Sequence, residues 1–170
     1  MDMIAFIGGG NMASAIIGGL RKNGREGAGI IVVDPGDAQR AKLANDFGVR
    51  ALAAADASLA RASLVVWAVK PQLFAAAAAP CAPYVSGALQ LSVMAGIRSD
   101  AIARASGSER VVRAMPNTPA LIGRGISGLF AHARRRRPGR RSGSIARKTS
   151  TPSPRCRARA RPMSSISSRR

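Results

Sequence analysis

Short, continuously apolar runs alternate with stretches of helical periodicity along residues 1–131, and this alternation constrains the fold more than any other feature. The apolar runs predict strands at residues 3–8, 29–34, 62–69, 88–97 and 110–115. Strands that are apolar at every position are buried on both faces, and the intervening helices supply the cover. The sequence therefore predicts an α/β fold with a doubly wound parallel sheet.

Two helices are predicted in the first half of this region. Residues 11–24 have apolar side chains at helical spacing, and residues 36–48 form a helix that Asp37 opens and Gly48 ends. In a doubly wound sheet a ligand binds outside the carboxyl ends of the strands. The residues that directly follow each strand are therefore the candidates for a binding site.

The later helical segments carry weaker signals. The alanine-rich segment 72–85 can start as a helix, but Pro80 and Pro83 are expected to break it. Residues 99–107 are predicted to form a short helix with Ser99 as its cap. Both segments lie between predicted strands, as crossover connections of a parallel sheet must.

A glycine-rich loop follows the first predicted strand and opens the first helix. Its pattern is Gly8-x-Gly10-x-x-Ala13, within "FIGGGNMASA". In this context Gly8 permits a tight turn, Gly10 lets the backbone approach a pyrophosphate, and Ala13 lets helix and strand pack closely. The amides of Asn11 and Met12 lie at a helix N-terminus, which favours an anion. The pattern predicts a Rossmann-like dinucleotide site; an ordinary glycine turn is the alternative.

Asp34 ends the second predicted strand, 24 positions after Gly10. A carboxylate there can accept hydrogen bonds from the ribose hydroxyls of NAD, and it would repel the 2′-phosphate of NADP. Arg40 could offset that repulsion. Alternatively, Asp34 only starts the turn at residues 34–36. The choice between NAD and NADP stays open at this level.

Other strand ends also lie at the predicted ligand edge. Backbone groups of Ala68–Pro71 can meet ribose or nicotinamide, and Lys70 is either a catalytic cation or a solvated lysine at a strand end. Residues 94–96 lie at the end of the fourth strand, and Asn117 lies at the end of the fifth, where it could donate to a carboxamide. Plain turn chemistry is the alternative for both of the later segments.

Composition excludes several classes of site. Cys81 and Cys156 match no metal or redox spacing, and His132 is the only histidine, so neither a metal site nor a histidine-based triad is expected in residues 1–131. No apolar run approaches the ~20 residues of a membrane span. The N-terminus does not look like a signal peptide, so a cytoplasmic protein without membrane contact is expected.

A basic tail follows the apolar part of the chain. Residues 132–170 hold 13 arginines, one lysine and no acidic residue, a charge of +14 out of the formal +19 of the whole chain. We expect two parts, a domain at residues 1–131 and a disordered tail at 132–170. Such a tail could bind nucleic acid nonspecifically through phosphates, which gives an alternative function, a dinucleotide-binding module with a basic arm.

Four segments, "FIGGGNMASAIIGGL", "AVKPQ", "SVMAGI" and "RVVRAMPNTPALIGRGISGLFA", resemble pyrroline-5-carboxylate reductases in that order. The resemblance covers residues 3 to about 131 and implies that NADPH or NADH reduces the imine of 1-pyrroline-5-carboxylate to proline, the last step of proline biosynthesis. Two departures are Asp34, which bears on NADPH use, and Ala55, where some relatives have asparagine. Motif and resemblance together give these candidate cofactor contacts: Ile7, Gly8, Gly9, Gly10, Asn11, Met12, Ala13, Asp34, Ala68, Val69, Lys70, Pro71, Val93, Met94, Ala95 and Asn117.

The resemblance also implies a second, all-helical domain that forms a homo-oligomer and holds most of the substrate site. Its "SGSGPA" segment does not occur in this chain, so the catalytic residues are expected in that missing part and this chain is expected to be impaired. One permitted codon string for residues 148–169, read one nucleotide earlier, encodes that segment. We interpret the tail as out of frame, with a frameshift near residues 131–137.

Overall fold

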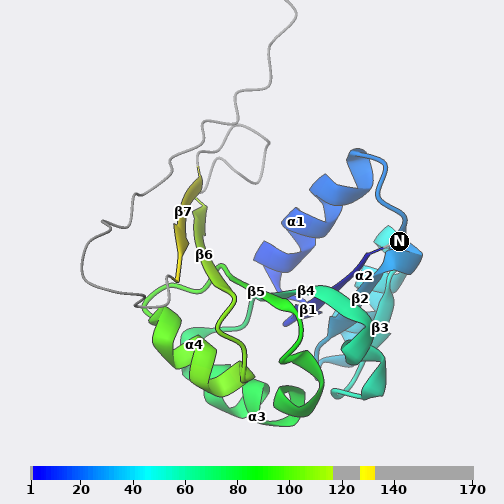
Figure 1. Cartoon of the computed structure of the whole chain (residues 1–170). Coiled ribbons are helices and arrows are strands. Elements are labelled where there is room, and N and C mark those ends of the chain that lie inside the picture. The colour runs from blue at the N-terminus through cyan, green and yellow to red at the C-terminus, as the bar shows by residue number, and fades with distance from the viewer. Residues whose placement is uncertain (1, 117–126, 133–170) are drawn as a thin grey trace, which may run out of the picture.

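The computed structural model describes residues 2–116 and 127–132. In this part of the chain a seven-stranded sheet has the order β3-β2-β1-β4-β5-β6-β7 (Figure 1). The strands are β1 Met3–Ile7, β2 Ile30–Val33, β3 Arg50–Leu52, β4 Ala62–Trp67, β5 Leu89–Ser92, β6 Val111–Pro116 and β7 Ser127–Ala131. The helices are α1 Asn11–Lys22, α2 Asp37–Phe47, α3 Phe74–Val85 and α4 Ser99–Ser106, with 3-10 helices at Gly27–Gly29, Ala57–Arg61 and Pro71–Leu73.

The sheet is doubly wound, as the sequence predicts. Strands β1 to β6 pair in parallel, and only β7 runs antiparallel, against β6. The chain moves outward from β1 through β2 to β3, then crosses back to β4 and moves outward the other way. The strand order therefore reverses between β1 and β4, which is where such sheets bind ligands.

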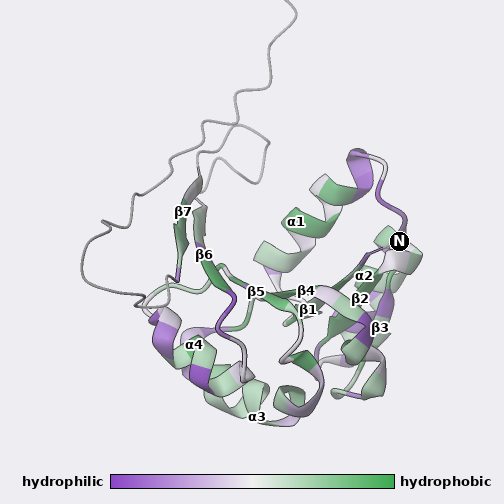
Figure 2. Cartoon of the chain, viewed as in Figure 1, coloured by the Kyte–Doolittle hydropathy of each residue, from purple (hydrophilic) through white to green (hydrophobic). Residues whose placement is uncertain are grey.

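Two apolar clusters, one on each face, hold the helices against the sheet. Phe6, Ile17 and Leu43 belong to the cluster beneath α1 and α2, while Trp67 and Ile102 belong to the cluster that α3 and α4 cover. All five side chains are fully buried. Figure 2 shows hydrophobic strands in the middle and hydrophilic patches on the outer side of α4 and at the end of α1. Burial on both faces explains why the strand sequences are apolar throughout.

A buried amide joins β4, β5 and the end of α3. The Trp67 indole N–H donates to Oε1 of Gln90 at 2.9 Å, and Nε2 of Gln90 donates to the carbonyls of Val85 (2.7 Å) and Ala88 (3.0 Å). Gln90 has no exposed surface. Its polar atoms are all paired, so this amide is tolerated in the core.

The expectation that Pro80 and Pro83 break the segment 72–85 is wrong. Helix α3 passes through both residues without interruption. The two prolines lie on its exposed side, and the opposite side buries Phe74 and Cys81 among others. Burial of that apolar side compensates the hydrogen bonds that proline removes, and a helix can bend around the missing bonds.

Two further boundaries differ from prediction. Ser99 is not the cap of α4, because Arg98 occupies that position and the Ser99 hydroxyl instead pairs with Nδ1 of His132 at 3.0 Å. Strand β5 ends at Ser92, and the chain turns farther along at Gly96, which has a φ of +74°. The rest of the predicted strand 88–97 is therefore a loop at the ligand edge.

Some expectations fall outside the described residues. Asn117 lies there, and so does the predicted tail apart from His132. Within the described part, no helix is long and apolar enough to cross a bilayer. The same residues contain no cluster of three or more histidine, cysteine, aspartate or glutamate side chains that could hold a metal ion.

The buried amide gives a prediction for stability. Replacing Gln90 with alanine leaves the Trp67 N–H unpaired, removes one of the two hydrogen bonds that each of the Val85 and Ala88 carbonyls accepts, and opens a cavity. The free energy of unfolding should therefore fall by about 2–4 kcal/mol. Urea denaturation followed by tryptophan fluorescence measures this. The control is Gln72→Ala at an exposed position, which should change the free energy by less than about 0.5 kcal/mol. Equal stabilities for the two variants would contradict the prediction.

Candidate functional site

Four strand ends meet at one edge of the sheet. The residues that directly follow β1, β4 and β5 remain hydrogen-bonded to a neighbouring strand. The Gly8 N–H donates to the last carbonyl of β2 at 2.8 Å. The Ala68 N–H donates to the last carbonyl of β1 at 2.9 Å, and the Val93 N–H donates to the last carbonyl of β4 at 3.2 Å. The loops after β1, β2, β4 and β5 are therefore held side by side. Four of the five candidate segments from the sequence, those around residues 8, 34, 68 and 93, are therefore adjacent.

Gly8 makes the first turn possible. Its φ is +94°, a conformation that side chains disfavour, and a Cβ there would lie 2.8 Å from the Ala68 carbonyl oxygen and 2.8 Å from Cγ1 of Val69. Only glycine fits between the β1 exit and the β4 exit. This close approach brings the two loops together at the switch point.

The amino end of α1 faces outward from this turn. Gly10 is the residue before the helix, is exposed, and has nothing within 4 Å of the position of an added Cβ. The N–H groups of Asn11 and Met12 lie in the first turn, where no intrahelical acceptor exists. Ala13 is fully buried and packs α1 onto the sheet. Free amides beside an open, glycine-lined position fit a pyrophosphate.

The Asp34 carboxylate connects the β2 exit to the glycine loop. Its Oδ2 accepts from the Gly9 N–H at 2.8 Å, and its Oδ1 accepts from the Gly36 N–H at 2.8 Å. Asp34 therefore does stabilise the turn at residues 34–36, as one interpretation of the sequence held. The same side chain also lies next to the loop, where the other interpretation places a ribose acceptor.

Sequence analysis missed Gln39, in the first turn of α2. Its Nε2 donates to the Gly9 carbonyl at 2.5 Å, so Gly9 is bonded through both of its backbone groups. Arg40 donates from Nη1 to the Asp34 carbonyl at 2.8 Å and pairs with Asp37 through Nη2. A polar residue on the inner side of the helix after an acidic strand end is the signal that could have found Gln39.

The loop after β4 offers mostly backbone. Ala68 and Val69 are half-buried, and Lys70 is exposed at the start of the 3-10 helix that Pro71 begins. Within the part of the chain that the structure describes, the ion pairs do not include the Lys70 ammonium. This placement suits a solvated lysine, and the segment presents its peptide groups to the edge.

Two other candidate residues have side chains that point into the core. Ile7 is 2% exposed and Met94 is 3% exposed. Only their backbone groups can contact a ligand at the edge. Val93, on the other hand, is half-buried and Ala95 is exposed, so these two side chains of the loop after β5 reach the surface.

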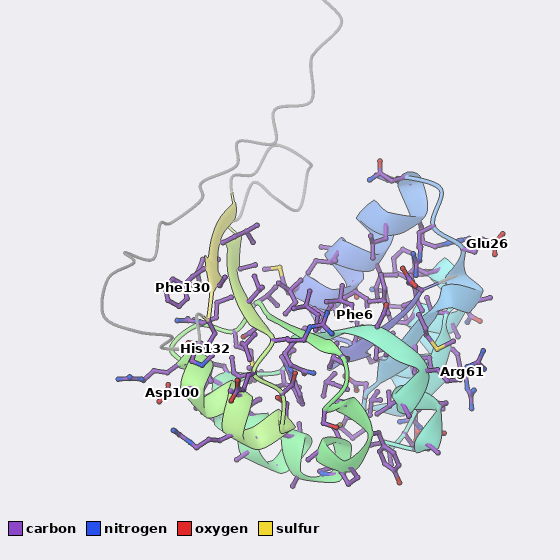
Figure 3. All side chains as sticks on the ribbon, viewed as in Figure 1. Phe6, Glu26, Arg61, Asp100, Phe130 and His132 are labelled. Atoms are coloured by element: carbon purple, nitrogen blue, oxygen red, sulfur yellow. The ribbon has the colours of Figure 1, made fainter. Side chains whose placement is uncertain are left out.

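The cysteine and histidine of the described region lie elsewhere. Cys81 is buried within α3, and burial raises the pKa of its thiol to about 11. His132 is bonded to Ser99, and Figure 3 shows it beside Phe130 and Asp100 on the β6–β7 side, opposite Glu26 and Arg61. Neither residue is joined to the glycine loop, in keeping with a site built from backbone amides and the Asp34 carboxylate.

Comparison with known proteins identifies relatives. The family model for NADP oxidoreductase, coenzyme F420-dependent, matches residues 3–96. The chain is 46% identical over 132 residues to pyrroline-5-carboxylate reductase of Pseudomonas aeruginosa, covering 76% of this chain and 48% of that protein. It is 33% identical to the solved pyrroline-5-carboxylate reductase of Coxiella burnetii, with a TM-score of 0.71 over 76% of this chain and 49% of the other.

A more distant structure shares the fold. The NADP-bound pyrroline carboxylate reductase of Plasmodium falciparum is 23% identical, with a TM-score of 0.64 over 76% of this chain and 48% of that one. In all three comparisons the match spans about half of the relative. The chain therefore corresponds to about half the length of the relatives it matches.

The glycine loop gives a paired prediction. Gly8→Ala should lower the free energy of unfolding by more than about 1 kcal/mol, because the methyl group meets the Ala68 carbonyl at a strained φ. Gly10→Ala should change stability by less than about 1 kcal/mol, because nothing lies near the added methyl group. It should still weaken dinucleotide binding at least about tenfold by occupying the pyrophosphate approach. Denaturation and calorimetric titration separate the two effects; a Gly10→Ala protein that binds like the wild type contradicts the placement.

The buried thiol gives a second prediction. In a Cys156→Ser background, Cys81 is the remaining cysteine. With a pKa of about 11 and 1% exposure, it should not react with a disulfide reagent at pH 8 while the protein is folded. Complete reaction is expected in denaturant. Rapid labelling of the native protein would place this thiol at an accessible surface instead.

Proposed function

The chain belongs to the pyrroline-5-carboxylate reductase family, and on that basis we propose that it forms the dinucleotide-binding part of such an enzyme. The observation that carries the proposal is the glycine loop between β1 and α1. Its middle residue is fixed by hydrogen bonds, and the free amides at the start of α1 face an open position. That arrangement fits the pyrophosphate of NAD or NADP.

We propose that the loops after β1 and β2 bind one half of the dinucleotide and the loops after β4 and β5 bind the other half. The amides of Gly10 to Met12 would hold the pyrophosphate, and the Asp34 carboxylate lies where the adenosine ribose would be bound. The peptide groups of Ala68–Pro71 and Val93–Ala95 would border the ribose and nicotinamide on the β4–β5 side. Residues 1–131 make up this unit, and residues 132–170 are proposed to take no part in it.

The proposed reaction reduces a cyclic imine to an amine. A bound reduced nicotinamide would supply a hydride to the imine carbon of 1-pyrroline-5-carboxylate, and the ring nitrogen would take a proton, which gives proline. The chain's residues contribute the orientation of the hydride donor, a large part of the rate advantage when two reactants must meet in one geometry. We assign imine positioning and the proton source to the part of the relatives that this chain does not match, which is also where we place the contacts that form the family oligomer.

Two charges at the adenosine end favour NADH. The Asp34 carboxylate would lie close to a 2′-phosphate and repel it. Arg40, the cation that could compensate, is already bonded to the Asp34 carbonyl and to Asp37. We therefore propose that NADH binds more tightly than NADPH.

The test is calorimetric titration of the purified chain with NADH and with NADPH, followed by addition of 1-pyrroline-5-carboxylate. Saturable binding at one site per chain is expected, with oxidation of the bound cofactor slow or undetectable. Failure to bind either dinucleotide overturns the proposal. Turnover at the rate of a full-length relative assayed alongside overturns the assignment of the imine site to the unmatched part.

The cofactor preference gives a further prediction. Asp34→Asn removes the negative charge and keeps an oxygen that can accept from the Gly9 N–H, so the ratio of NADPH affinity to NADH affinity should rise about tenfold. The ratio is the measured quantity, because any loosening of the loop weakens both cofactors together. Asp46→Asn, at an exposed position of α2, is the charge-matched control. An unchanged ratio in Asp34→Asn removes Asp34 from cofactor selection.

A further inference from the structure

Gly9 is bonded through both of its backbone groups to the segment that joins β2 to α2. Its N–H donates to Oδ2 of Asp34 at 2.8 Å, and its carbonyl accepts from Nε2 of Gln39 at 2.5 Å. From this geometry we propose that Gln39 is a positioning residue that orients the 9–10 peptide so that the Gly10 N–H faces the pyrophosphate. The proposal rests on the dinucleotide site described under the proposed function.

The planarity of the peptide bond gives the reason. In a trans peptide the carbonyl of one residue and the N–H of the next point in opposite directions. The Gln39 amide holds the Gly9 carbonyl toward α2, so the Gly10 N–H must point away from α2. Gly10 is exposed, and the space around its added Cβ is empty. The N–H is therefore directed to the open side of the loop.

The glycines of this loop make a positioning residue for the 9–10 peptide necessary. Three consecutive glycines at positions 8–10 allow many backbone conformations, and each costs entropy to fix. Gly8 is fixed by the bond from its N–H to the Val33 carbonyl, and the Gly10 carbonyl accepts from the Ser14 N–H at the start of α1. The hydrogen bonds to Gly9 fix the peptide between them. Preorganised amides bind an anion more tightly because less freedom is lost on binding.

Gln39 suits this role because its amide can donate to a carbonyl. It is half-buried in the first turn of α2, and its Nε2 also lies 3.4 Å from Oγ of Ser14 on α1. The Ser14 hydroxyl itself donates to the Gly9 carbonyl at 3.4 Å, a longer and weaker bond. Gln39 is therefore the main donor that fixes this carbonyl. A carboxylate at position 39 would instead repel it.

The local fold does not depend on Gln39. Helix α2 buries Leu43, and Arg40 anchors its first turn to the Asp34 carbonyl. Loss of the Gln39 amide should therefore leave the fold intact, and its effect should appear in dinucleotide affinity. This separates a positioning role from a purely structural one.

The experiment compares three variants of the full chain by calorimetric titration with NADH at pH 7.5. Gln39→Ala should weaken binding about fivefold, the value of one hydrogen bond. Gln39→Glu should weaken it further, because a carboxylate faces the Gly9 carbonyl. Asn45→Ala, which removes an exposed amide from the same helix, should bind like the wild type. Thermal denaturation confirms that all three remain folded.

A pH profile supplies a second measurement that a structural role would not change. Once protonated, the carboxyl group introduced by Gln39→Glu can donate to the Gly9 carbonyl, so NADH binding by this variant should recover toward wild type as the pH falls from 7.5 to 5. The charged groups around position 39 are Asp34 at the end of β2 and Asp37 and Arg40 on α2. The wild type and Gln39→Ala contain the same charged groups. The pH dependence of their NADH affinity therefore shows how much of the change in Gln39→Glu comes from groups other than the new carboxyl.

The outcomes are distinct. Wild-type binding with unchanged affinity in Gln39→Ala and Gln39→Glu overturns the role of Gln39 and leaves the dinucleotide site standing. Equal losses in the two variants with no recovery at low pH also overturn it. Absence of binding by the wild type instead overturns the proposed function on which the inference rests.

Discussion

Burial of the central strands on both faces is the constraint on which the rest of this structure depends. Strand β1 sends Phe6 to one apolar cluster and Ile7 to the other, and β4 does the same with Val66 and Trp67. Nothing polar can be placed along such strands without a partner, as the fully paired Gln90 shows. Polar chemistry is therefore confined to the strand ends, where the exits of β1, β2, β4 and β5 meet.

At that edge a group that stabilises the fold is also a proposed ligand contact. The Asp34 carboxylate closes the turn to α2 through Gly36 and fixes the glycine loop through Gly9. A substitution there changes the shape of the loop as well as its charge. This is why cofactor selection at Asp34 is best read from the ratio of two affinities.

Much of this architecture could be predicted from the sequence, because apolar runs and glycines report local constraints. The parallel sheet, the α1 amino end and the close contact at Gly8 all follow from such patterns. Strand β3 could not be predicted, since Arg50–Leu52 is three residues long and is defined by its pairing with β2. The break predicted from the prolines of α3 is absent, because burial of the helix's apolar side outweighs local helix propensity. Gln39 was missed because its role depends on a contact 30 residues away.

The glycine loop is held within the unit formed by β1, α1, β2 and α2. Among the described residues, those that bond to Gly9 all lie between Gly8 and Arg40, and Ala68 and Val69 add a more distant wall beside Gly8. All of these residues lie within the part that matches half of each relative. The glycine loop can therefore form from interactions within this chain. Placing an imine carbon against a bound nicotinamide is a separate requirement, because it needs surfaces on the other side of the cofactor. The proposed function thus assigns dinucleotide binding to this chain and imine positioning to the part of the relatives that the chain does not match.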